Sequence, residues 1–337
     1  MKNKILKTVS LILASLMLLV CFSSCRNEIK PGDVSTNSEK PKVKMNVSVM
    51  KGPTAIGMMG LMRQDKNEAA KNDYDFQIFT APDQAVAAVV NKSVDIAAVP
   101  TNLAATLYKK TNGGVSVIAA TTTGVLHILT KDQNVKTIAD LKGKKLYATG
   151  QGATNEYVLN FLLEKNGLVL GKDIEVIYKA EHSELASLML TGEAEYALLP
   201  DPFATTVTNK NKDIKKVIDL ANAWESVPEN KNNNLIMGCL IVRNEYLEQN
   251  PEAVKTFLLE YSTSVQALQL LDETLDNAEE FEIISRDAVI PVIPSCVYYT
   301  GDKMKNAISS YLDILFKSNP ASVGGSLPDD AFYYSAK

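Results

Sequence analysis

Histidine, arginine and tryptophan are scarce in this chain of 337 residues, and their scarcity excludes several kinds of site. The two histidines, His127 and His182, have no cysteine or second histidine at ligand spacing, so no metal site is expected. Only four arginines are present and the net charge is −4, which argues against nucleic acid as a partner. Neither a Walker-type phosphate loop nor a nucleophile elbow occurs. We therefore expect no catalytic centre and no cofactor.

Each histidine has a simple structural interpretation. His127 lies in an apolar run, which favours a core or hinge position. His182 stands between Glu181 and Glu184, which predicts a surface residue at the start of a helix.

Cysteine is also rare, with four in the chain, and two of these lie within the first 25 residues. A basic start and an apolar run over 9–20 precede Ser23, Ser24 and Cys25. This order is typical of a secretory signal, and the run is shorter than the roughly 20 residues that span a membrane. The Ser-Ser-Cys ending resembles a lipobox, although Phe22 stands where leucine is usual. We predict a signal peptide over 1–25 and a lipid on Cys25; an ordinary signal peptide is the alternative.

Residues 26–42 contain almost nothing apolar, so they cannot bury enough surface to offset their ordering entropy, and we predict a flexible tether. The remaining cysteines, Cys239 and Cys296, are expected to be two separate buried thiols.

An internal repeat indicates the architecture. Residues 51–54 match 151–154, and 95–100 match 195–200, both at an offset of 100. A third match at the same offset, 73–78 with 173–178, lies between them. Agreement over three stretches predicts two structurally similar halves.

Strand and helix patterns alternate within each half. Strands are expected at 46–50, 76–79, 95–99, 145–149, 174–178 and 196–199, and helices at 53–62, 83–90, 101–108, 152–165 and 181–190. Alternation of this kind predicts parallel sheets covered on both faces. Apolar runs at 124–129 and 235–242 are predicted to be strands that cross between the halves. Two further helices, near 251–268 and 303–316, are expected to pack on the first half.

Ligands of open parallel sheets bind beyond the carboxyl ends of the strands, where helices begin and backbone N–H groups are unpaired. Four turns here occupy such places, and each taken alone is also explained as a cap or turn. Trp224 is predicted either to stack on a ligand or to pack in the core. The candidate ligand-binding residues are Lys51, Gly52, Pro53, Thr54, Thr101, Asn102, Thr123, Gln151, Gly152, Thr154, Asp201, Phe203 and Trp224.

The chain resembles solute-binding proteins of ABC transporters, in the group of nitrate, sulfonate, taurine and thiamine-pyrimidine-precursor binders. The resemblance covers nearly the whole chain after Cys25. It rests on Lys-Gly-Pro-Thr at 51–54, Asp-Ile-Ala-Ala-Val-Pro-Thr-Asn at 95–102, Ile-Ala-Asp-Leu-Lys-Gly-Lys at 138–144, Gly-Gln-Gly-Ala-Thr at 150–154, Leu-Pro-Asp-Pro-Phe at 199–203 and Gly-Gly-Ser-Leu-Pro at 324–328.

This resemblance implies an α/β fold like that of type II periplasmic binding proteins, with two α/β lobes joined by two hinge crossings. Lobe I is predicted to comprise 43–126 and 236–337, and lobe II 127–235. The implied protein is a monomer, anchored by lipid at the outer face of the cell membrane. It captures a small solute between its lobes and delivers it to an ABC permease with its ATPase subunits.

The sequence leaves the solute and two rival functions open. Few arginines in the expected cleft favour a thiamine-pyrimidine-like heterocycle over a sulfonate, with Lys51 available for one acidic group. An enzyme on the same fold, similar to a pyrimidine-precursor synthase, would need a cysteine-rich motif that is missing here and would be misplaced by an export signal. The other alternative is a ligand sensor or adhesin that does not transport.

Overall fold

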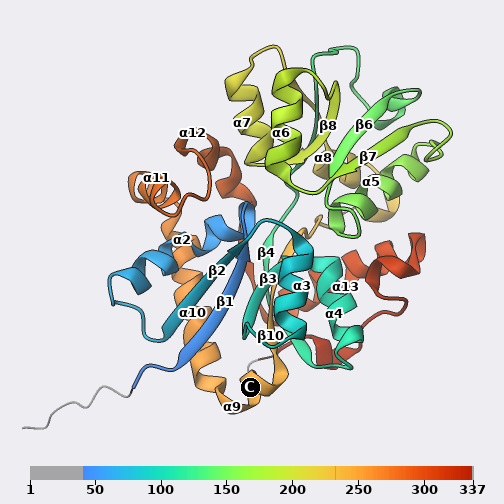
Figure 1. The fold of residues 1–337 in the computed structure, drawn as a ribbon. Helices are drawn as coiled ribbons and strands as arrows, with labels where there is room; N and C mark the ends of the chain where they lie inside the picture. Colours follow the sequence, from blue (N-terminus) through green and yellow to red (C-terminus); the bar gives the residue numbers. More distant parts are fainter. Residues whose placement is uncertain (1–40, 232, 336–337) are drawn as a thin grey trace, which may run out of the picture. The chain divides into compact units, whose positions relative to one another are not determined.

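Two mixed β-sheets flanked by helices make up the structure, a computed structural model that describes residues 41–231 and 233–335 (Figure 1). The predicted signal peptide, its Cys25 and nearly all of the predicted tether lie outside the described residues. The described residues from Lys42 onward form one compact unit. No helix within the described ranges combines the length and apolar character needed to cross a membrane.

The first sheet, called sheet A, has six strands in the order β11-β4-β10-β3-β1-β2. Strands β1, β2 and β3 are parallel, whereas β10 runs antiparallel to both β3 and β4. The strands of sheet A are β1 (Lys44–Met50), β2 (Asp73–Phe79), β3 (Ile96–Pro100), β4 (Val115–Thr122), β10 (Gly238–Arg243) and β11 (Cys296–Tyr299).

The second sheet, called sheet B, has five strands in the order β7-β6-β8-β5-β9. Strand β6 is parallel to β7 and β8, and β5 is antiparallel to β8 and β9. The strands of sheet B are β5 (Leu126–Thr130), β6 (Lys145–Thr149), β7 (Glu175–Lys179), β8 (Tyr196–Pro200) and β9 (Lys215–Asp219).

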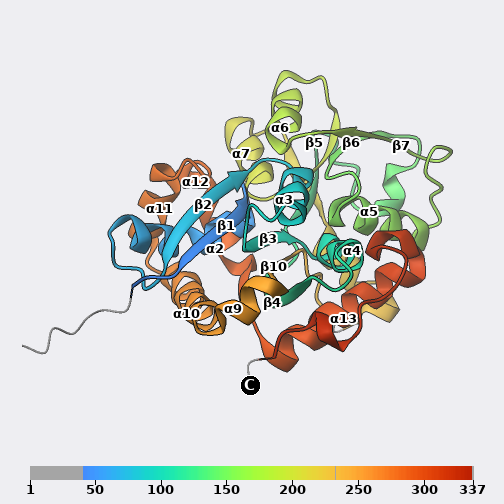
Figure 2. The ribbon, with the colours of Figure 1, turned by 60° about the horizontal axis from the view of Figure 1, so that its bottom comes forward.

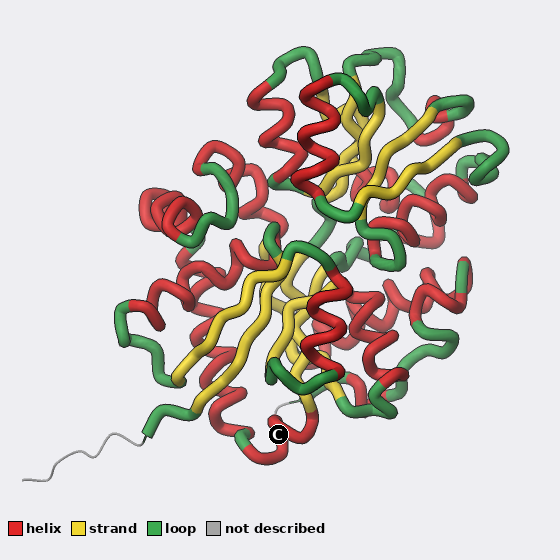
Figure 3. Tube along the Cα trace, viewed as in Figure 1, coloured by secondary structure: helices red, strands yellow, loops and turns green. Residues whose placement is uncertain are grey.

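Helices cover both faces of each sheet (Figure 3). Lobe I consists of sheet A with α2 (Pro53–Lys66), α3 (Pro82–Val90), α4 (Thr101–Lys110), α9 (Asn244–Gln249), α10 (Pro251–Ala267), α11 (Leu271–Glu280), α12 (Arg286–Val289) and α13 (Gly301–Ser318). Lobe II consists of sheet B with α5 (Thr154–Lys165), α6 (His182–Thr191), α7 (Phe203–Lys210) and α8 (Leu220–Glu225). Short 3₁₀ turns lie at Ile138–Leu141, Pro228–Asn230, Ile290–Ser295, Pro320–Val323 and Asp330–Phe332.

The internal repeat is confirmed by the topology. Strands β1, β2 and β3 recur as β6, β7 and β8 in the same spatial order, each triplet with an antiparallel strand beside its third member. Ala97 pairs with Ser48 in sheet A and Ala197 pairs with Tyr147 in sheet B, so the register of the first strand differs by one residue from the offset of 100. Both lobes are therefore built on one βαβ pattern.

The expected parallel pairing is confirmed for β1, β2 and β3 and for β6, β7 and β8, but each sheet also contains antiparallel strands. The chain crosses from lobe I to lobe II between β4 and β5 and returns before β10, so β5 and β10 enter their sheets from the opposite direction. Both strands begin only after the crossing, at Leu126 and Gly238, later than the expected starts. Strands β4, β9 and β11 were not predicted.

Helices α10 and α13 are present where expected, but α13 does more than pack on lobe I. It also contacts α5 of lobe II. Asn250 precedes α10 but makes no side-chain cap bond to it; its side-chain amide donates back to the Tyr246 carbonyl oxygen at 3.3 Å. Cys239 and Cys296 are both buried, free thiols, as expected.

Helix α2 lies against α10 through two glycines. The Ser264 hydroxyl of α10 donates to the Gly57 carbonyl oxygen at 2.8 Å and accepts from the Leu61 N–H at 3.1 Å. A Cβ atom on Gly60 would lie 2.8 Å from Ser264 Oγ and 3.1 Å from Ser264 Cα. The absence of a side chain at Gly60 thus sets how close the two helices approach, and α2 follows directly on the turn that carries Lys51.

We expect Gly60→Val to lower the free energy of unfolding by about 1–3 kcal/mol, because the added atoms overlap the backbone of α10. Urea denaturation measures this change. Thr263→Val, a similar side chain at an exposed position of α10, is the control and should stay within about 0.5 kcal/mol of the parent. Equal stability of the two variants would contradict the close contact between α2 and α10.

Candidate functional site

The carboxyl ends of β1, β3 and β8 contribute to a cavity of about 80 Å³ between the two lobes. Its wall is largely apolar, with a few polar groups from lobe I, lobe II and the crossing segments. The lining residues are Met50, Lys51, Pro53, Thr54, Pro100, Thr122, Val125, Asn155, His182, Pro200, Met237 and Gly238. This inner cavity lies at the strand ends that the sequence singled out.

Lys51 is the lysine of the inner cavity. Its backbone N–H is tied to the Phe79 carbonyl oxygen at 2.7 Å, which fixes the turn after β1. Gly52 follows with φ of 137°, a backbone conformation that favours glycine, and Pro53 opens α2. No ion pair involves the Lys51 ammonium among the described residues, so its charge remains available to a ligand.

Three helices that begin at this cavity lack a side-chain cap. Within the described part of the chain, the N-cap residues Gly52 of α2, Ala153 of α5 and Glu181 of α6 make no side-chain hydrogen bond to the first N–H groups of their helices. The first N–H groups of these helices therefore add partial positive charge next to Lys51. The arrangement favours a ligand atom that accepts hydrogen bonds.

His182 starts α6, as predicted, but it lines the inner cavity instead of the outer surface. Its Nδ1 lies 2.7 Å from the Thr149 hydroxyl at the end of β6, and its ring centroid lies 5.1 Å from that of Phe203. Burial lowers the pKa of His182 to about 4, so the ring is neutral at pH 7.

A second group of candidate residues joins the lobes directly. The Thr154 hydroxyl at the start of α5 donates to Asn102 Oδ1 of α4 at 2.9 Å. The Asn102 amide in turn donates to the carbonyl oxygens of Gly152 at 3.4 Å and Ser322 at 3.1 Å. Asn102 is fully buried, so these bonds satisfy a group that would otherwise be costly, and those with Thr154 and Gly152 join the two lobes.

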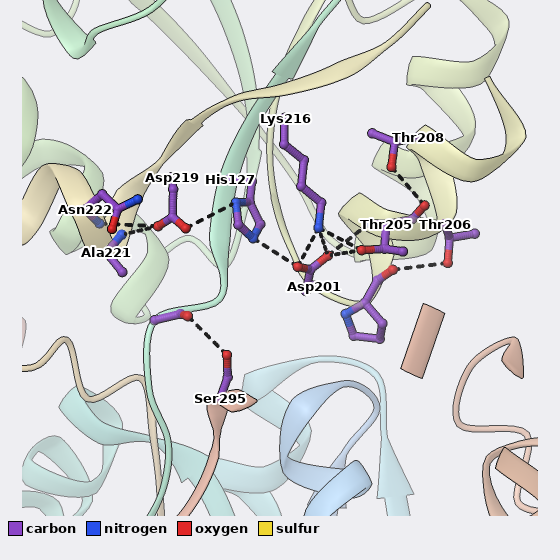
Figure 4. A network of polar contacts seen from close by, with 12 residues as sticks. His127, Asp201, Thr205, Thr206, Thr208, Lys216, Asp219, Ala221, Asn222 and Ser295 are labelled. Carbon is purple, nitrogen blue, oxygen red and sulfur yellow. Dashed lines mark hydrogen bonds and ion pairs between the residues drawn. The ribbon is translucent and has the colours of Figure 1, made fainter. Parts of the chain in front are cut away.

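Asp201 belongs to a polar network inside lobe II (Figure 4). Its carboxylate accepts from Lys216 Nζ at 2.6 and 2.7 Å, pairs with His127 Nε2 at 3.0 Å and caps the Thr205 N–H at 3.0 Å. Burial opposes ionisation, but His127 and Lys216 outweigh it and hold the pKa of Asp201 well below its usual range. His127 also lies 4.0 Å from Asp219. Asp201 therefore positions the start of α7 and has its hydrogen-bonding capacity used within the lobe.

Trp224 takes the core-packing role of the two that the sequence left open. Its side chain is fully buried, and its ring centroid lies 4.9 Å from that of Phe161 and 5.6 Å from that of Tyr311. Its indole N–H donates to the Asn233 carbonyl oxygen. No face of the indole is left for a ligand.

The remaining candidates are dispersed. Thr101 is buried at the start of α4, and the Thr123 N–H donates to the Ser295 carbonyl oxygen at a crossing. Gln151 is exposed. Phe203 and Lys51 line a larger outer pocket of about 470 Å³, with residues of α6, α7, α11 and the segment 281–285.

Several residues of the inner cavity were not among the candidates predicted from the sequence, including Thr122, Asn155 and His182. Thr122 is the neighbour of the predicted Thr123 and is the last residue of β4. If β4 had been predicted, the alternation of side chains along the strand would have distinguished Thr122 from Thr123. Asn155 follows the predicted Thr154 on the first turn of α5. A wider search of each helix start would have found it.

The fold and the cleft between two α/β lobes are those of periplasmic binding proteins. The chain belongs to the family described as "ABC transporter, phosphonate, periplasmic substrate-binding protein", whose model matches residues 67–289. The enzyme interpretation is thereby disfavoured, because this family consists of substrate-binding proteins.

Individual relatives are distant. A putative binding protein of Brucella abortus is 26% identical over 186 residues, and the match spans 55% of this chain and about half (54%) of that protein's length. An ABC transporter structure from Parabacteroides distasonis has a TM-score of 0.70 at 22% identity and covers 88% of this chain and 100% of its own. The alkanesulfonate-binding protein SsuA from Xanthomonas axonopodis, bound to MOPS, has a TM-score of 0.65 at 15% identity, with coverages of 86% and 96%. These two structures show the shared fold.

The lowered pKa of His182 makes stability depend on pH. The unfolded chain binds a proton at this residue near pH 6.5 and the folded chain only near pH 4, so its contribution is complete above pH 6.5 and is lost as the pH falls toward 4. The full loss in the free energy of unfolding from this residue is about 3 kcal/mol. Asp201 acts at lower pH, since its stabilisation is lost only as the pH falls below its ordinary pKa.

We expect His182→Gln to remove most of the loss of unfolding free energy that His182 causes between pH 7 and pH 5. Urea denaturation of both proteins at the two pH values measures the difference, and the carboxylates common to both cancel. A difference in stability at pH 7 does not affect the test, because the test compares the change with pH in each protein. An unchanged dependence of stability on pH in the variant would contradict a partly buried, neutral His182.

Proposed function

We propose that this chain is the extracytoplasmic solute-binding component of an ABC importer and that it captures a small organic acid between its lobes. The observation that carries the proposal is Lys51, a cation without a carboxylate partner in the described residues, at the edge of a mostly apolar cavity between the lobes. Membership of the binding-protein family supports capture and delivery to a permease and ATPase. No catalytic role is proposed.

The charge of the inner cavity favours a solute with a single negative charge. Lys51 supplies one positive charge, while the lowered pKa of His182 keeps that ring neutral. A phosphonate dianion would leave one of its charges without a partner in a partly desolvated site, which is costly. A sulfonate, which carries one charge over three acceptor oxygens, matches the lysine and the uncapped helix starts.

The size of the inner cavity points the same way. About 80 Å³ holds on the order of five to eight water-sized groups, since one such group needs about 10–15 Å³. A sulfonate with a short carbon chain fits this space. We therefore propose a sulfonate in place of the heterocycle that the sequence favoured. The outer pocket, which shares Lys51, offers room for a longer substituent.

The anchoring and the limits of the lobes are part of this proposal. Cys25 carries the lipid, residues 26–42 form the tether, and the monomeric binder is held at the outer face of the cell membrane. Lobe I comprises 43–126 and 236–337, and lobe II 127–235. The distribution of the strands between sheets A and B supports this division.

Lys51→Gln should weaken sulfonate binding about ten- to hundredfold, because it removes a charged hydrogen-bond donor and leaves the side chain length similar. Isothermal titration of the protein lacking residues 1–25 with methanesulfonate and ethanesulfonate measures the affinity. Lys215→Gln, an exposed lysine of β9, is the matched control and should bind like the parent. Methylphosphonate and a hydroxymethylpyrimidine complete the panel. Tighter binding of either compound than of the sulfonates would overturn the proposed solute class.

Cys25→Ala should abolish lipid attachment and release the folded protein from the membrane fraction. Metabolic labelling with a fatty-acid analogue and fractionation of the cells measure both effects. Cys21→Ala is the matched control, and it should still be labelled and sediment with membranes. Labelling that is lost in the Cys21 variant and kept in the Cys25 variant would show that Cys25 is not the lipidated residue.

A further inference from the structure

The ring of His182 stands at the inner cavity with one nitrogen held and the other free. Nδ1 lies 2.7 Å from the Thr149 hydroxyl, whereas Nε2 has no hydrogen-bond partner among the described residues. The residue lines the same cavity as Lys51, and its ring packs against Phe203. The atom available to a ligand on this side of the cavity is therefore Nε2.

The surroundings of Thr149 decide which nitrogen carries the proton. Thr149 is fully buried, and its hydroxyl has His182 Nδ1 as its partner. If the hydroxyl accepted from Nδ1–H, its own proton would be left unsatisfied in the interior, which is costly. If it donates to Nδ1, that cost disappears and the ring proton resides on Nε2. The second arrangement leaves an Nε2–H group at the cavity.

No carboxylate among the described residues pairs with His182 to hold a second proton on its ring. On its own helix, Glu181 accepts from Ser183 and from Thr80 of lobe I, and Glu184 pairs with Lys179 of β7. From lobe I, the charged group at the cavity is Lys51, which disfavours a positive ring. The imidazole is thus a hydrogen-bond donor without charge.

We propose that His182 determines the specificity of the inner cavity by presenting a fixed, neutral Nε2–H donor, with Thr149 as the residue that positions it. The inference rests on the proposed function and extends it by naming what the lobe II side of the cavity recognises. The solute must offer an acceptor oxygen to His182 while it offers a negative charge to Lys51. A fully ionised sulfonate does both, because all three of its oxygens accept.

The same geometry rejects other solutes. A protonated acid or an amino group directed at lobe II would place a donor hydrogen against Nε2–H. A phosphonate that retains one proton can turn an acceptor toward His182 only in some orientations, so it loses part of its binding. The neutral donor therefore separates groups that only accept from groups that also donate.

The tautomer is measured directly on the free protein. Long-range proton–nitrogen correlation spectra of protein labelled with ¹⁵N-histidine distinguish Nε2–H, Nδ1–H and the doubly protonated ring. The chain has only two histidines, and the spectrum of His182→Gln assigns them. We expect Nε2–H at pH 7 for His182. A spectrum of Nδ1–H or of the charged ring would overturn the inference without any ligand being present.

The positioning role of Thr149 is tested by Thr149→Val and Thr149→Ser. Valine keeps the shape and deletes the hydroxyl, so the His182 ring should populate both tautomers and methanesulfonate affinity should fall several-fold. Serine keeps the hydroxyl and should restore both the single tautomer and the affinity. A merely structural role would leave the tautomer unchanged in the valine variant.

His182→Phe keeps an aromatic ring against Phe203 and removes the donor, and methanesulfonate binding should weaken about tenfold or more. Sulfonate binding that persists undiminished in this variant, but is lost in Lys51→Gln, would overturn the inference and leave the proposed function standing. If the parent protein binds no sulfonate, the proposed solute class fails, and the donor assignment is then decided by the spectrum of the free protein.

Discussion

The arrangement of the two lobes depends on an apolar contact that continues from one lobe into the other. Trp224 of α8 is fully buried between Phe161 of α5 and Tyr311 of α13, so a single hydrophobic core contains residues of both lobes. Helix α13 lies beside α4 and α5 (Figure 2). Truncation of a buried aromatic of this size costs about 3–5 kcal/mol, far more than any one polar contact between the lobes. The lobes are thus joined along this side, where the Ser318 hydroxyl of α13 also donates to the Glu164 carboxylate of α5 at 3.2 Å.

The internal repeat is structural, but equivalent residues have acquired different partners. Thr54 and Thr154 occupy matching positions at the first turns of α2 and α5. The Thr54 hydroxyl donates to the Met50 carbonyl oxygen of its own lobe, whereas the Thr154 hydroxyl donates across the lobes to Asn102. One half therefore contributes the charged turn with Lys51 and the other half contributes the contact between lobes. Two halves with the same fold therefore form a cleft whose two walls carry different functional groups.

Much of the fold was predictable because it depends on local pattern and on the offset of 100 residues. The strands that were not predicted show the limit of prediction from local pattern. Every residue of β4 is buried, so the strand has no alternation of polar and apolar residues to reveal it. The crossing strands β5 and β10 were recognised, but their antiparallel direction follows from the path of the chain between the lobes and has no local pattern.

The candidate site was less predictable, because the roles of its residues depend on contacts distant in sequence. His182 was assigned to the surface since its neighbours in sequence are acidic, yet its position is set by Thr149 and Phe203. Asp201 follows a strand and precedes a helix, which is typical of ligand-binding residues. Its charge is nevertheless used by Lys216 on β9. Only the turn at Lys51 combines a predictable position with a charge that no described residue pairs.

That unpaired charge also links binding to closure in the proposed function. Bringing the lobes together around an empty cavity would desolvate the Lys51 ammonium without supplying a partner, which carries a free-energy cost. A monoanionic solute removes this cost, so it binds the closed arrangement more tightly than the open one. The hydrogen bonds of Asn102 with Thr154 and Gly152 stabilise closure with or without a solute, so they cannot discriminate between solutes. Discrimination rests instead on the groups that only the solute can satisfy, Lys51 from lobe I and His182 from lobe II.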